Sequence, residues 1–130
     1  SGWLGTGPKT AEFERRFAEY CHVPHAIAVS SCTAALHLTL LSAGAGPGTG
    51  VITTPFTFAA TVNAIIHAGA VPLLVDIDRA SMNLSPSRLQ EFLERDCTPG
   101  ADGRRVHRAS GVEVLGIVPV HFAGRPCEMD

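Results

Sequence analysis

The segment from Ala28 to Leu38, Ala-Val-Ser-Ser-Cys-Thr-Ala-Ala-Leu-His-Leu, carries the clearest chemical pattern of the chain. It predicts an apolar strand that passes through a hydroxyl-rich turn, Ser30 to Thr33, directly into a helix. The first N–H groups of a helix have no partner inside it, and the helix dipole adds partial positive charge there. Together with the hydroxyl groups they suit one compact phosphate monoester. Helix capping by Ser31 or Thr33 explains the same residues without a ligand, so both interpretations stay open.

A dinucleotide site requires a different pattern, Gly-x-Gly-x-x-Gly between a strand and the helix that follows it. The turn after Val29 contains no glycine. The glycine cluster from Gly44 to Gly50 follows a predicted helix and precedes a predicted strand, which is the wrong order. We interpret this cluster as a connection in which glycine lets the chain turn. The sequence therefore argues against a dinucleotide-binding fold of this kind.

Other polar residues have simpler explanations than catalysis. His37 and His67 fall on predicted apolar helices, where a packed or partly exposed position is favoured over a catalytic one. His121 follows a predicted strand, and a position facing a pocket is its less favoured interpretation. Asp76 and Asp78 form a pair of carboxylates, but at the end of a strand they suit the hydrogen bonds of a turn. The histidines and cysteines show no spacing typical of a metal site.

The elements that must position these residues alternate between strands and helices. Strands are predicted over 25–30, 51–54, 71–77 and 113–120, helices over 9–20, 33–43, 57–68 and from Ser85-Pro86 onward, and an exposed loop over 98–111. This order predicts an α/β fold of three layers, a mostly parallel sheet with helices on both faces. Because no closing helix follows the last strand, we expect residues 1–130 to be the incomplete N-terminal part of a larger domain.

Composition narrows the class of protein. Hydrophobic residues make up 45% and charged residues 17% of the chain, which is typical of a globular interior. A net charge of −2 with scattered basic residues gives no nucleic-acid footprint. No apolar run reaches membrane-spanning length, the N-terminus lacks a signal-peptide pattern, and four separated cysteines predict reduced thiols. We expect a cytoplasmic protein with neither a nucleic-acid nor a membrane partner.

Several separated segments resemble one family in both sequence and spacing. They are Gly7-Pro8-Lys9, Val29 to His37, Ile52 to Thr61, Ala68 to Pro72, Val75 to Asp78 and Pro119 to Gly124. The sequences and the order of these segments are similar to those of the sugar aminotransferases dependent on pyridoxal 5′-phosphate (DegT/DnrJ/EryC/StrS type), which act on nucleotide-linked keto sugars. The resemblance runs from Ser1 to Asp130. It implies the cofactor-binding large domain of a fold type I pyridoxal phosphate transferase, in truncated form.

The resemblance implies cofactor-binding roles for three residues. Cys32 and Thr33 match the phosphate cup, where a small residue followed by Thr or Ser offers a backbone N–H and a hydroxyl. Phe58 matches the aromatic residue that stacks on the pyridine ring of the cofactor. Without the resemblance, a core position on an apolar helix is the favoured explanation for Phe58. Trp3 resembles part of an N-terminal entry loop near the substrate.

The resemblance also implies what these residues lack. Lys9 is the only lysine, and it matches a family position unrelated to catalysis. Enzymes of this type need a lysine for the Schiff base and an acidic partner for the ring nitrogen, and in the family both come after the segment that ends at Asp130. We therefore expect no catalytic residue in this chain and no activity from its 130 residues alone.

The implied full-length parent is an aminotransferase of cell-envelope or antibiotic sugar biosynthesis. It is expected to move an amino group from an amino-acid donor, glutamate, to a nucleotide-linked keto sugar, and to work as a cytoplasmic homodimer. Two alternatives remain open at this point. One is a dehydratase of the same family, in which histidine replaces the lysine, and the other is a non-catalytic binding or partner subunit.

Overall fold

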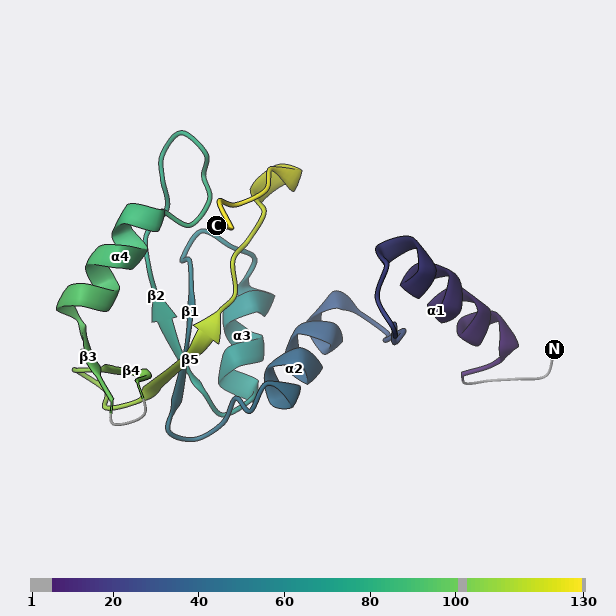
Figure 1. Ribbon diagram of the computed structural model, residues 1–130, viewed down its shortest axis with the longest axis horizontal. Coiled ribbons are helices and arrows are strands. Elements are labelled where there is room, and N and C mark those ends of the chain that lie inside the picture. The colour runs from purple at the N-terminus through teal and green to yellow at the C-terminus, as the bar shows by residue number, and fades with distance from the viewer. Residues whose placement is uncertain (1–5, 101–102, 130) are drawn as a thin grey trace. The chain divides into compact units, whose positions relative to one another are not determined.

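The computed structural model describes residues 6–100 and 103–129. The chain forms two compact units, the first ending at Cys32 and the second beginning at Thr33 (Figure 1). Each unit has its own local organisation, and the second contains the sheet.

The first unit contains one helix, α1 (Pro8–Cys21). Pro8 occupies the first position of the helix, where its missing N–H costs nothing. His22 ends the helix in the left-handed conformation, with φ at 55°. The rings of Phe13 and Phe17 lie 5.7 Å apart between centroids, and both remain exposed together with Tyr20. Within the first unit, the other residues therefore cover the apolar stripe of this helix only in part.

The strand predicted over 25–30 is wrong. Residues 23–29 have no regular secondary structure, and no strand in the described part of the chain pairs with them. The backbone N–H of Ala28 instead donates to Oε1 of Glu14 at 2.8 Å. An apolar run becomes a strand only when a neighbouring strand pairs with its backbone groups. Here the Glu14 side chain accepts the backbone hydrogen bond of Ala28 instead.

The second unit is built on a five-stranded sheet in the order β2-β1-β5-β4-β3. Its strands are β1 (Thr49–Thr53), β2 (Val71–Leu74), β3 (Cys97–Pro99), β4 (Arg105–His107) and β5 (Glu113–Ile117). β2 and β5 both pair with β1 in parallel, whereas β3, β4 and β5 are joined by antiparallel pairs. The central strands are thus parallel, and the antiparallel part is confined to short strands at one edge.

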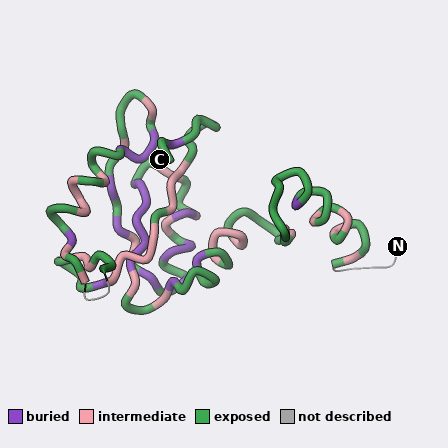
Figure 2. The backbone as a smooth tube through the Cα atoms, viewed as in Figure 1, coloured by how far each residue is buried: buried purple, intermediate pink, exposed green. Residues whose placement is uncertain are grey.

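Helices cover both faces of this sheet (Figure 1). On one face, α2 (Cys32–Ser42) and α3 (Ala59–His67) contribute Leu40, Ala64 and Ile65 to a buried cluster around Val51. On the other face, α4 (Pro86–Arg95) packs its apolar stripe against a cluster that contains Ile52. Adjacent residues of a strand point to opposite faces, so Val51 and Ile52 belong to different clusters. The three-layer α/β prediction is confirmed, and Figure 2 shows the buried residues concentrated on the strands and α3.

The exposed loop predicted over 98–111 is wrong in part, because β3 and β4 form an antiparallel pair there. Cys97 is buried at the start of the pair, and burial raises the pKa of its thiol. The ring of His107 stacks on Phe92 of α4, with centroids 5.5 Å apart. The many Gly and Arg residues hid this pattern, since few apolar side chains are needed to hold two short strands against a helix.

Candidate functional site

Two segments meet at the carboxyl ends of the neighbouring parallel strands β1 and β5. The backbone N–H of Val118 donates to the carbonyl of Ile52 at 2.8 Å. The hydroxyl of Thr53, a fully buried residue, donates to the carbonyl of Val118 at 2.9 Å. These bonds hold the segment after β5 beside the loop after β1. In open α/β sheets, ligands bind outside the carboxyl ends of the strands.

An open hollow of about 430 Å³ lies between these two segments. Its lining residues are Pro55, Phe56, Thr57, Phe58, Val120, His121, Phe122 and Ala123. The rings of Phe56 and Phe122 contact each other across the two segments, with centroids 5.0 Å apart. The hollow is therefore walled mainly by apolar side chains from both segments.

Phe58 lies at the N-cap of α3 rather than in the core. Its backbone is extended, with φ at −64° and ψ at 138°, so the side chain stands outside the helix stripe. The residue is 83% exposed. An exposed aromatic ring beside an apolar hollow is typical of a binding surface. Of the two interpretations of Phe58, the core position is therefore wrong, while stacking on a cofactor stays a prediction.

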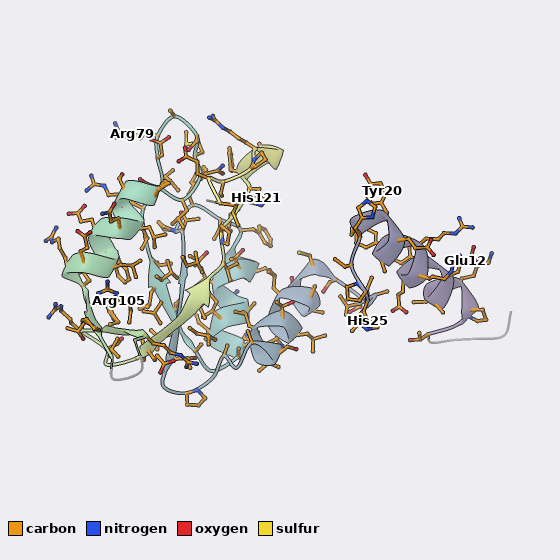
Figure 3. All side chains as sticks on the ribbon, in the orientation of Figure 1. Glu12, Tyr20, His25, Arg79, Arg105 and His121 are labelled. Carbon is orange, nitrogen blue, oxygen red and sulfur yellow. The ribbon has the colours of Figure 1, made fainter. Side chains whose placement is uncertain are left out.

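His121 lines the same hollow as Phe58. Figure 3 labels His121 on the segment that follows β5. Its Nδ1 accepts a hydrogen bond from the backbone N–H of Cys127 at 3.0 Å. The thiol of Cys127 donates to the carbonyl of Val120 at 3.2 Å. The position facing a pocket, which the sequence favoured less, is thus the one that the structure shows.

Cys32 and Thr33 are the first two residues of α2, and both are exposed. The helix start predicted for them is confirmed to within one residue. Cys32 is a free thiol. Their part in a phosphate cup stays a prediction. Lys9 lies in the first turn of α1, and Trp3 lies outside the described residues.

Asp78, His37 and His67 make turn and packing contacts of the kind that the sequence predicts for them. Oδ1 of Asp78 accepts hydrogen bonds from the backbone N–H groups of Ala80 and Ser81 and from the Ser81 hydroxyl. These bonds, the one from the Ser81 backbone foremost, hold the pKa of Asp78 below its usual value. The rings of His37 and His67 pack edge to face, with centroids 6.3 Å apart. Across residues 6–100 and 103–129, no cluster of three or more potential ligands is arranged to hold a metal ion.

Asn83 is a site residue that the sequence analysis missed. It is only 4% exposed. Its Nδ2 donates to the carbonyls of Arg125 and Pro126, both at 3.0 Å, and its Oδ1 accepts from the N–H of Phe122 at 2.9 Å. The side chain thereby anchors the segment that carries His121. An asparagine after a strand usually indicates a turn, so no local signal distinguishes this buried one.

The comparison with known families accounts for this arrangement. The model of the DegT/DnrJ/EryC1/StrS aminotransferase family matches residues 1–130. The chain belongs to this family. It is 45% identical over its whole length to the spore coat polysaccharide biosynthesis protein SpsC of Bacillus subtilis, of which it spans 29%.

Solved structures of similar sequence share the fold. DesV of S. venezuelae superposes with a TM-score of 0.82 at 32% identity, over 100% of this chain and 30% of that one. The pyridoxal phosphate form of a putative sugar aminotransferase from Streptococcus pneumoniae superposes with a TM-score of 0.78 at 33% identity, over 98% of this chain and 28% of that one. These neighbours confirm the predicted fold class. Within the described segments, every helix is too short or too polar to cross a bilayer.

Proposed function

We propose that this chain forms part of the cofactor-binding domain of a pyridoxal 5′-phosphate-dependent sugar aminotransferase. The observation that carries the proposal is Phe58, an exposed aromatic ring beside an apolar hollow at the carboxyl ends of β1 and β5. Membership of an aminotransferase family and structural neighbours solved with pyridoxal or pyridoxamine phosphate support it.

The residues present fit a phosphorylated aromatic ring. The flat face of Phe58 suits a pyridine ring and shields one side of it from water. The start of α2 offers the backbone N–H groups of Cys32 and Thr33, the Thr33 hydroxyl and the small side chain of Cys32 to a phosphate. When bound, the cofactor supplies a reactive aldehyde and an electron sink for amino transfer. The part of these residues is to bind and orient it.

The substrates and the assembly belong to the same proposal. The acceptor is a nucleotide-linked keto sugar, the amino donor is glutamate, and the protein works as a cytoplasmic homodimer. The sugar aminotransferase among the structural neighbours supports a sugar acceptor.

Titration of the full-length protein with pyridoxal 5′-phosphate tests the proposal, with absorbance or fluorescence as the signal. Phe58→Leu keeps an apolar side chain but removes the flat ring, so we expect affinity to fall about two- to tenfold. Phe58→Tyr keeps the ring and is expected to bind as the wild type does. Because Phe58 is exposed, neither change is expected to alter the thermal unfolding midpoint without cofactor. A wild-type protein that does not bind the cofactor would falsify the proposal.

A further inference from the structure

We propose that His121 donates a hydrogen bond from its Nε2–H to the ring hydroxyl oxygen of the pyridoxal phosphate held against Phe58. The inference rests on the proposed function and assigns a further binding residue to its site. His121 and Phe58 line one hollow, although 63 positions separate them in the sequence (121 − 58).

The hydrogen bond at Nδ1 determines which nitrogen of His121 is left to bind a ligand. Since the N–H of Cys127 donates to Nδ1, that nitrogen presents a lone pair. The proton of the neutral ring is then on Nε2, on the other side of the imidazole. No partner within the described chain accepts from Nε2. His121 is thus prepared to donate one hydrogen bond.

Among the described residues that line the hollow, one side chain besides His121 is polar. It is Thr57, whose hydroxyl is hydrogen-bonded to the Thr61 hydroxyl at 2.9 Å, with either oxygen able to donate. The remaining lining residues are Pro, Phe, Val and Ala. Ligand sites of this kind orient their ligand through a few polar groups in an apolar wall. A ring with a hydroxyl oxygen offers the acceptor that Nε2–H lacks.

The segment that carries His121 is held from both sides. Asn83 bonds the backbone at Phe122, Arg125 and Pro126. Cys127, which is buried, bonds both the imidazole and the carbonyl of Val120. A donor contributes most to binding when its position is set before the ligand arrives, and these bonds set the position of the imidazole.

The test compares variants of the full-length protein that differ only in what the side chain can donate. His121→Gln and His121→Met have similar length and both lose the ring, but only glutamine keeps an N–H near the position of Nε2. His121→Asn keeps an acceptor for the N–H of Cys127 and loses the donor. We expect the affinity for pyridoxal 5′-phosphate to fall about five- to tenfold in the Met and Asn variants and to stay within about twofold in the Gln variant.

The ligand offers a matched second measurement. The 3-deoxy analogue of pyridoxal phosphate lacks the ring hydroxyl, so the wild type and His121→Met should bind it equally well. Equal affinity of the Gln and Met variants for the complete cofactor would overturn the inference. So would a loss in the Met variant that persists with the analogue. If the wild type binds the cofactor while these comparisons fail, the proposed function stands and the role of His121 alone is refuted. If His121→Asn does not fold, the comparison of cofactor affinity between His121→Gln and His121→Met still tests the inference.

Discussion

At the residue scale, the four cysteines divide into two classes. Cys21 and Cys32 are exposed, whereas Cys97 and Cys127 are buried. The thiolate is the reactive form of cysteine, and burial raises the pKa of the Cys97 thiol, so this residue stays protonated and unreactive. Cys32 is the first residue of α2, where the proposed phosphate would cover it. The exposed pair thus provides one probe in the predicted cup and one outside it.

We predict that pyridoxal 5′-phosphate protects Cys32 from alkylation but leaves Cys21 reactive. At a hundred times the dissociation constant, a phosphate that covers the thiol slows labelling of Cys32 about 100-fold, because only the free protein reacts. Labelling with iodoacetamide, followed by mass spectrometry of the peptides, measures both rates in one sample. Cys97 and Cys127 are expected to react only after unfolding. Equal labelling of Cys32 with and without cofactor would contradict the phosphate cup.

At the element scale, the parallel pairing of β1 depends on a close approach at Gly50. A Cβ atom at this position would lie 2.7 Å from the Val112 side chain and 2.8 Å from that of Leu73. Both neighbours are buried, so they have little room to move. Gly116 on β5 has no atom within 4 Å of the corresponding position. The two glycines of the same sheet therefore serve different purposes.

We predict that Gly50→Ala lowers the free energy of unfolding by about 1–3 kcal/mol, the usual cost of overpacking a core. Gly116→Ala is the matched control. It is expected to be neutral or to stabilise by up to about 1 kcal/mol, because alanine loses less backbone entropy than glycine in a strand. Urea unfolding followed by circular dichroism measures both variants. A stable Gly50→Ala protein would show that β1, β2 and Val112 have more freedom than this packing allows.

The helices and strands differ in whether the sequence pattern alone was enough to predict them. The helices and the three parallel strands were predictable because their apolar periodicity is local. The strand over 25–30 was not, because a strand requires a partner, and Glu14 accepts from Ala28 instead. The pair of β3 and β4 was missed for the opposite reason, since its polar composition resembles a loop while Cys97 and His107 hold it in place.

At the scale of the whole molecule, the sheet leaves edges open. Among the described residues, β2 pairs only with β1, and β5 meets β4 at the single pair of Val106 and Glu113. Leu74 of β2 and Ile117 of β5 are exposed beside these edges. Unpaired backbone groups next to apolar side chains favour pairing with another chain.

We predict that the 130-residue chain, expressed by itself, associates at micromolar concentration. The double variant Leu74→Lys with Ile117→Lys should shift the distribution toward monomer, because charge on an edge opposes strand pairing. Sedimentation velocity distinguishes the two outcomes. A monodisperse wild-type monomer would show that the open edges are protected.

The sequence by itself determined the helices, the parallel strands and the family, and through the family the residues expected at the cofactor, Cys32, Thr33 and Phe58. Only the tertiary structure placed Phe58 and His121 in one hollow, showed which nitrogen of His121 is free, and revealed the part of Asn83. The physical reason is the distance along the sequence over which each kind of interaction acts. Helix and strand periodicity act over a few residues, whereas Asn83 bonds carbonyl groups 42 and 43 positions away, and such contacts exist only once the sheet has brought its loops together.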